Sequence, residues 1–232
     1  MLRKLLRKIV GKMPLEVAEK EFHGRISYSQ EGEDLIIAKI LEEKSSGFFV
    51  DIGAHHPMRF SNTYYFYLKG WRGINVDPLP GTKKLFDQER PEDINIEAGV
   101  SEKEQKIKYF MFNDPALNTF SAEEAEKKDG ANGVYRIIKT VDVNTCSLAT
   151  ILNNYLPANT AIDLLTIDAE GFDDVVLYSN DWDKYQPKII LIEELRSDGN
   201  MIINNSKIYS FLKPLGYKLV SRTPNTSIYQ KM

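Results

Sequence analysis

The sequence is poor in the residues that make disulfides and zinc sites. Its 232 residues include one cysteine, Cys146, and three histidines. A single cysteine excludes an internal disulfide and fits a reducing compartment, so we expect a cytoplasmic protein. So few cysteines and histidines argue against a structural zinc site, and carboxylates would have to hold any bound metal. No apolar run approaches the roughly 20 residues that cross a bilayer, which excludes a transmembrane helix.

Positive charge is scarce beyond the first 13 residues. Residues 1–13 carry five basic side chains and no acid, and the remaining 25 basic and 33 acidic residues leave a net charge of −8. Binding to nucleic acid requires a broad basic face, because the phosphates must be neutralised. We therefore expect no nucleic-acid partner.

The sequence predicts an N-terminal segment at 1–26 followed by one domain at 27–232. Within this segment, one helical face carries four apolar side chains opposite the basic ones, namely Leu2, Leu5, Leu6 and Ile9. Charges interrupt the apolar core that a signal peptide needs. Such a segment can rest on an anionic membrane surface, and the alternative that we favour is a short capping helix or a frayed terminus.

Short apolar runs alternate with segments of helical periodicity along the domain, which predicts one α/β unit. The runs predict strands at 48–53, 73–77, 93–99, 162–168 and 188–194, with added strands at 107–112 and 136–143. The periodic segments predict helices at 30–43, 61–69, 80–89, 147–156, 172–179 and 203–216. Residues 113–136 predict a loop with one helical turn at 121–128, and a substrate lid is its functional interpretation.

This alternation predicts a mostly parallel sheet with helices on both faces. The last two runs, YKLVSR at 217–222 and TSIYQK at 226–231, predict an antiparallel hairpin that completes seven strands. A terminal hairpin is typical of a methyltransferase-type sheet rather than a dehydrogenase-type one.

Acidic residues follow the predicted strands, where ligands bind in folds of this kind. These acids are Asp51, Asp77, Glu97, Asp168, Glu193 and Glu194. After the first strand Gly53 allows a ligand to approach the backbone, but the glycine pattern that cradles a pyrophosphate is missing. Asp77 has the position of an acid that receives two ribose hydroxyls. Together these features favour an adenosine cofactor of the S-adenosylmethionine kind.

Three segments resemble the FkbM family of methyltransferases: SYSQEGEDLII at 27–37, FVDIGAHHPMRFSNTYYFYLKGWRGINVDP at 49–78 and LLTIDAEGFDDVVL at 164–177. The resemblance covers most of residues 27–195, including the spacing between segments. It implies a Rossmann-like class I methyltransferase fold, S-adenosylmethionine as methyl donor, and O-methylation of sugars or natural products. It does not identify the acceptor, which we expect to be a small molecule or a glycan.

The resemblance also assigns cofactor residues. Asp51, Gly53 and Ala54 match the cofactor loop, Asp77 matches the ribose acid, and Asn62 either touches the methionine end or caps the next helix. The complete predicted set is Asp51, Gly53, Ala54, His55, Asn62, Asp77, Pro78, Ala98 and Gly99, of which the last two would line the adenine.

Asp168 and Glu170 form the predicted catalytic centre. Methyl transfer depends mainly on positioning the acceptor, but a hydroxyl must also lose its proton to a base. Asp168 has the best position for this role, and His56 or His55 is the alternative. A magnesium ion held by Asp168, Glu193 and Glu194 would lower the pKa of the hydroxyl. The alternative for Glu193 or Glu194 is a structural pair with Arg196 or Lys218.

Two other functions compete with this prediction. A nicotinamide-dependent oxidoreductase also uses a Rossmann sheet, but the missing glycines and the terminal hairpin argue against it. A non-catalytic module could bind S-adenosylmethionine without transferring its methyl group, although the acids at the strand ends favour catalysis. The oligomeric state is left open.

Overall fold

The computed structural model describes residues 23–194 and 206–232. The predicted amphipathic segment at 1–13 and the proposed partner Arg196 lie outside these residues. Among the described residues, no helix has the length and apolar character that crossing a membrane requires.

A seven-stranded sheet forms the centre of the fold, in the order β3-β2-β1-β7-β8-β10-β9. The first five of these strands are parallel, and β10 runs antiparallel to both β8 and β9. Their bounds are β1 Phe48–Ile52, β2 Arg72–Asp77, β3 Ile94–Glu97, β7 Leu164–Ile167, β8 Ile189–Glu193, β9 Tyr217–Arg222 and β10 Thr226–Lys231. The predicted mostly parallel sheet with a C-terminal antiparallel hairpin is therefore confirmed.

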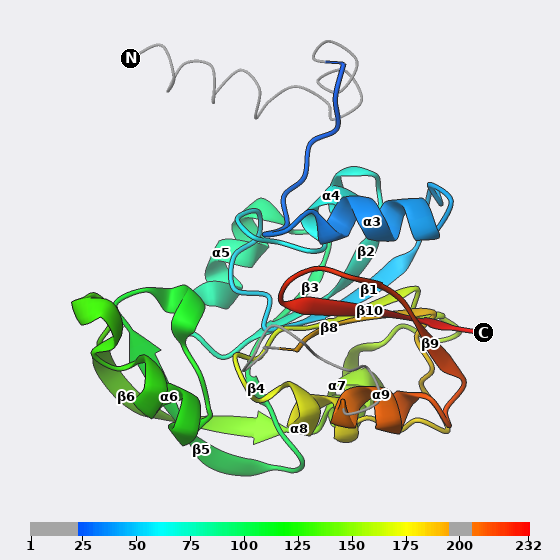
Figure 1. The fold of residues 1–232 in the computed structure, drawn as a ribbon. Helices are drawn as coiled ribbons and strands as arrows, with labels where there is room; N and C mark the ends of the chain where they lie inside the picture. The colour runs from blue at the N-terminus through cyan, green and yellow to red at the C-terminus, as the bar shows by residue number, and fades with distance from the viewer. Residues whose placement is uncertain (1–22, 195–205) are drawn as a thin grey trace.

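Helices cover both faces of this sheet (Figure 1). On one face lie α3 Glu33–Ile40, α4 Tyr64–Leu68 and α5 Thr82–Glu89, and on the other lie α7 Leu148–Tyr155, α8 Asp173–Tyr178 and α9 Lys207–Leu212. Successive side chains of a strand point to opposite faces, so each buried strand supplies two cores. In β7, Leu164 packs in the α3–α4 core and Leu165 in the α7–α9 core. This double burial explains the continuous apolar runs in the sequence.

A second, three-stranded sheet lies beside the main one (Figure 1). It has the order β4-β6-β5, with bounds β4 Gly99–Val100, β5 Gln105–Phe112 and β6 Ile137–Cys146. The predicted added strands at 107–112 and 136–143 pair with each other here. Between them lie a 3-10 turn η1 (Pro115–Leu117), the helix α6 (Ala122–Lys128) and a second turn η2 (Ala131–Gly133). Helix α6 coincides with the helical turn predicted at 121–128, and Ser121 caps its first turn.

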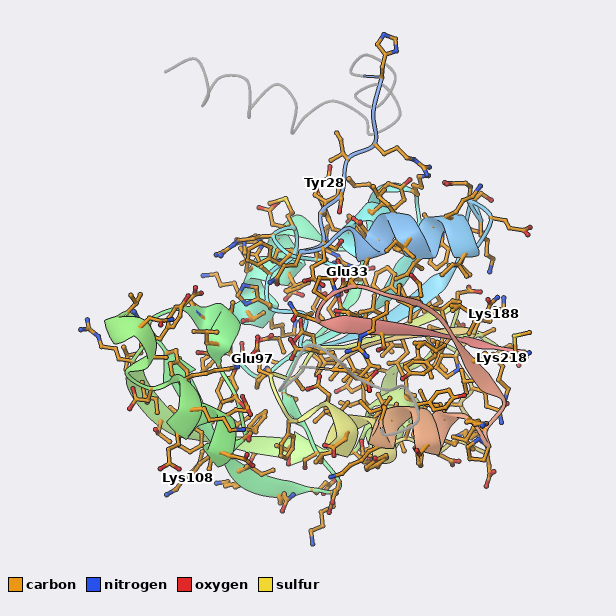
Figure 2. All side chains as sticks on the ribbon, in the orientation of Figure 1. Tyr28, Glu33, Glu97, Lys108, Lys188 and Lys218 are labelled. Carbon is orange, nitrogen blue, oxygen red and sulfur yellow. The ribbon has the colours of Figure 1, made fainter. Side chains whose placement is uncertain are left out.

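The prediction of one strand at 93–99 was wrong, because that segment belongs to two sheets. Strand β3 ends at Glu97, and Gly99 already begins β4. Figure 2 shows Glu97 where the chain leaves the main sheet for the second one. Gly99 packs so closely on the second sheet that a Cβ there would lie 2.6 Å from the Phe120 ring and 2.7 Å from Thr145.

Candidate active site

A cavity opens at the carboxyl ends of β1, β2 and β7. Ligands bind at this edge of the sheet in folds of this kind. Its wall contains these predicted cofactor residues: Asp51, Gly53, Ala54, His55, Asn62, Asp77, Pro78 and Ala98. The predicted catalytic acids Asp168 and Glu170 lie in the same wall. The fold thus brings together residues that are spread over 120 positions of the sequence.

Gly53 joins the tips of β1 and β7. Its φ of +81° is a conformation that glycine adopts at little cost, and a Cβ there would lie 1.7 Å from the carbonyl oxygen of Asp168,. The amide of Asp168 donates to the carbonyl of Ile52 at 2.9 Å, and the amide of Gly53 donates to the carbonyl of Val76 at 2.9 Å. At the floor of the cavity, the backbone of Gly53 therefore packs directly on the backbone of Asp168.

Asp51 is buried at the end of β1, and a chain of hydrogen bonds holds its carboxylate in place. Its Oδ2 accepts a hydrogen bond of 2.7 Å from the hydroxyl of Thr63, and Thr63 in turn accepts one of 3.0 Å from the guanidinium of Arg90. Burial raises the pKa of Asp51 to about 6, although the Thr63 bond and the charge of Arg90 oppose the shift. This polar chain leaves one edge of the carboxylate for a ligand.

Asp77 fixes the loop that follows β1. Its Oδ2 accepts from the amide of His55 and its Oδ1 from the amide of Leu79, both at 2.8 Å. Burial raises the pKa of Asp77 to about 6, against the effect of these two bonds. A carboxylate oxygen has two lone pairs, so both oxygens keep an acceptor position for ligand hydroxyls.

Three acids gather at the tips of β7 and β8. Asp168, Glu170 and Glu193 each place one carboxylate oxygen within 4.8 Å of the others. Burial, followed by the charge of Glu170, raises the pKa of Asp168 well above its ordinary value, and burial and Asp168 raise that of Glu193. Burial also raises the pKa of Glu170, while the ammonium of Lys128 lowers it. Like charges this close in a buried site favour shared protons or a bound cation.

The second sheet and α6 close one side of the cavity. Tyr109 and Phe120 line it, and the hydroxyl of Thr119 donates to the carbonyl of Glu170 at 2.8 Å. Lys128 on α6 pairs with the Glu170 carboxylate. Part of the segment predicted as a lid therefore forms a wall tied to the acidic loop. Sequence reasoning missed Tyr109 and Phe120: the aromatic content of 109–112 was the signal for Tyr109, and Phe120 lies in the segment predicted as a loop.

The structure corrects the prediction that His56 is a base. Its Nδ1 accepts hydrogen bonds of 3.0 Å from the amides of Met58 and Arg59. A neutral imidazole that accepts at Nδ1 carries its proton on Nε2, so neither nitrogen is free to take a proton. His56 also lies outside the cavity wall, whereas His55 lies within it. His56 is a scaffold residue of the turn.

Two further expectations are corrected by the placement of side chains. Glu194 turns away from Asp168 and Glu193, and accepts from the hydroxyls of Tyr229 at 2.9 Å and Ser206 at 2.5 Å. Neighbouring strand residues face opposite sides, so Glu193 and Glu194 could not both reach the cluster, and Glu170 takes the third position,. Gly99 packs under Phe120 instead of lining the cavity.

The strand order, the terminal hairpin and a glycine turn without a phosphate cradle define the class of a Rossmann-like S-adenosylmethionine-dependent methyltransferase. The model of the methyltransferase FkbM domain matches residues 51–219, and the chain belongs to this family.

Among solved structures, the chain is similar to a TehB-like SAM-dependent methyltransferase from Corynebacterium glutamicum ATCC 13032 Kitasato. The TM-score is 0.41 at 9% identity, over 91% of this chain and 92% of that one. No curated protein matches the sequence.

The packing of Gly53 predicts the effect of Gly53→Ala. The new methyl group would overlap the Asp168 carbonyl, so the tips of β1 and β7 must move apart. We expect unfolding in urea to show a loss of about 1–3 kcal/mol or more, together with loss of S-adenosylhomocysteine binding in calorimetry.

Gly70→Ala is the matched control. Gly70 has a φ of +89° but nothing within 4 Å of the added Cβ. It should lose only about 1 kcal/mol from backbone strain and keep its ligand affinity. Equal ligand binding by the two variants would contradict the packing argument.

Proposed function

We propose that this methyltransferase transfers a methyl group to a hydroxyl of a small-molecule or glycan acceptor, with Asp168 as the general base. One observation supports this most strongly. Within the described part of the chain, no donor contacts the Asp168 carboxylate, although it lies at the tip of a central strand in the cavity wall. A half-buried carboxylate without a partner is costly to maintain, which favours a role in binding or proton transfer,.

The cofactor would occupy the cavity at β1, β2 and β3. Asp51 would receive the amino group of its methionine part, and Asp77 the two ribose hydroxyls. The loop of Gly53, Ala54 and His55 would contact it through the backbone, with the adenine beside Ala98. Asn62 and Pro78 would complete the wall. The residues present fit this ligand, because the site offers carboxylates for a cation and hydroxyls and no cradle for a pyrophosphate.

Bound S-adenosylmethionine would supply an electrophilic methyl group on a positively charged sulfur. Asp168 would then hold the acceptor hydroxyl and take its proton at a carboxylate oxygen as the new carbon–oxygen bond forms. The methyl carbon–sulfur bond would break in the same step, with neutral S-adenosylhomocysteine as the leaving group. Its raised pKa makes Asp168 a stronger proton acceptor than an exposed carboxylate,. Glu170 would maintain this raised pKa through repulsion. Tyr109 and Phe120 would limit the access of water from the side of the second sheet.

The raised pKa values of Asp51 and Asp77 predict how cofactor affinity depends on pH. Both must be ionised to bind an amino group and ribose hydroxyls, and both have a pKa of about 6. Affinity for S-adenosylhomocysteine should therefore fall below about pH 6, by up to about tenfold per pH unit for each group. Calorimetry over a pH series measures this slope, and Asp77→Asn should reduce it. A dissociation constant independent of pH would reject the assignment.

The ligand-free protein should show the opposite trend in stability. A carboxyl whose pKa is raised in the folded state binds more protons there than in the unfolded chain between about pH 4 and pH 6. The free energy of unfolding should therefore fall as the pH rises through this window, as urea titrations would measure.

Asp168→Asn tests the base. The change keeps the shape of the side chain and relieves repulsion, so the variant should fold at least as stably as the wild type. Turnover should fall about 100- to 10,000-fold with little change in cofactor affinity. Asp174→Asn in the first turn of α8 is the control, because among the described residues the Asp174 carboxylate accepts one hydrogen bond, from the amide of Val175. Wild-type turnover by Asp168→Asn, measured as formation of S-adenosylhomocysteine, would exclude Asp168 as the base.

A magnesium ion is the second form of this proposal. Asp168, Glu170 and Glu193 offer the oxygen ligands that Mg²⁺ prefers, and a bound ion would lower the pKa of an acceptor hydroxyl,. In that case EDTA should abolish turnover and leave S-adenosylhomocysteine binding intact, and Mg²⁺ should restore turnover. Full turnover in EDTA would exclude a required metal ion. The three acids would then share protons instead.

A further inference from the structure

A second, smaller cavity adjoins the first one. It lies at the tips of β7 and β8, between the start of β10 and the start of α3. The two cavities share Gln30, Phe60, Asn62 and Asp168 in their walls. If the cofactor fills the first cavity, the second begins on the far side of Asp168. It is therefore placed to hold the acceptor, and its chemistry indicates the acceptor class.

The wall of this cavity carries four carboxylates: Glu31, Glu33, Asp168 and Glu193. The other lining residues include the amides of Gln30, Asn62 and Asn225 and the hydroxyl of Thr226, and the described lining contains no lysine, arginine or histidine. Figure 2 shows Glu33 at the start of α3, and Lys188 and Lys218 at the opposite end of the main sheet. Two cations of the described residues are already engaged, since Lys128 pairs with Glu170 and Arg59 stacks on the Phe60 ring.

Two acceptor atoms of residues that line this cavity lack hydrogen-bond donors in the described part of the chain, and they indicate which kind of ligand suits it. The side-chain oxygens Oε2 of Glu193 and Oδ1 of Asn62 are fully buried and have no hydrogen-bond partner among the described residues. By contrast, Glu31 and Glu33 are held in place, because Glu31 accepts from the amide groups of Asn225 and Glu33 from the amide of Glu31. The wall of the cavity thus combines a fixed acidic rim with two buried acceptors that lack donors in the described chain. A ligand that donates N–H groups suits such a wall better than one that brings further acceptors.

We propose that the acceptor is an amine-bearing hydroxyl compound, such as an amino sugar, whose ammonium group binds among Glu31, Glu33 and Glu193 while its hydroxyl meets Asp168. This inference rests on the proposed function and names its substrate class. A protonated amine offsets the charge of the acids and donates hydrogen bonds to the lone pairs that their oxygens keep. A phosphate or carboxylate on the acceptor would be repelled, so sugar nucleotides and sugar phosphates are excluded.

Two sets of three sugars test the proposal, and each set compares an amine, its neutral parent and a phosphate on the same ring. The first set is glucosamine, glucose and glucose 6-phosphate, and the second is galactosamine, galactose and galactose 6-phosphate. Binding to the complex with S-adenosylhomocysteine is measured by ligand-observed NMR and calorimetry. We expect each amine to bind at least about tenfold more tightly than its neutral parent, and the phosphates more weakly still. Equal affinities, a preference for the phosphates, or no detectable binding of either amine would overturn the inference.

Glu193→Gln is the matched variant, because it removes one charge and keeps the shape. The preference for the amine over the neutral sugar should fall by about tenfold or more, while affinity for S-adenosylhomocysteine is unchanged. Glu126→Gln makes the same chemical change at an exposed position of α6 and should leave the preference intact. An unaltered preference in Glu193→Gln would overturn the assignment of the ammonium site.

Turnover separates this inference from the proposed function. Methylation of an amino sugar on oxygen, located by NMR of the product, supports both. Methylation on nitrogen would overturn the hydroxyl proposal and leave the amine preference standing. Methylation of neutral or anionic hydroxyl compounds, without methylation of amines, would support the hydroxyl proposal and overturn the amine preference.

Discussion

The contact between Gly53 and the carbonyl of Asp168 is the constraint on which the rest of the site depends. It sets the separation of β1 and β7 at their tips, with no side chain between them. Asp51 and Asp77 lie on one side of this contact, and the acids around Asp168 lie on the other. A ligand that reaches from Asp77 to Asp168 must therefore cross the glycine backbone. Under the proposed function, this arrangement would bring a methyl donor held on β1 and β2 to an acceptor held on β7 and β8.

The acids around this contact are a liability in the ligand-free protein. Burial raises the pKa of Asp51, Asp77, Asp168 and Glu193, which means that the fold disfavours their charged forms,. Placing positive charge among them reverses this cost, whether it comes from a sulfonium, an amino group or a metal ion. The stability of the site and its affinity for cationic ligands are thus two consequences of the same buried charge. Lys128 offsets part of this charge, because it pairs with Glu170 and its charge lowers the pKa of Glu193.

Most of the fold could be predicted from the sequence, because β1, β7 and β8 are short apolar runs buried on both faces. Segments of helical periodicity lie between the strands of the main sheet. The break after Glu97 could not, because it depends on Gly99 packing against Phe120, a contact between residues far apart in the chain. In the site, Asp51, Asp77 and Asp168 lie in the cavity wall, as expected of residues at strand tips, and their roles stay predictions. The role of His56 was not predictable, because its Nδ1 is occupied by amides of its own turn.

A structure of the complex with S-adenosylhomocysteine tests the central claim most directly. The account predicts that both ribose hydroxyls bond to the carboxylate of Asp77, that the amino group lies at Asp51, and that the sulfur faces Asp168 and the second cavity. The loop at Gly53 should keep its backbone conformation. A ligand bound elsewhere, or one whose sulfur points away from Asp168 and toward the second sheet, would contradict the account.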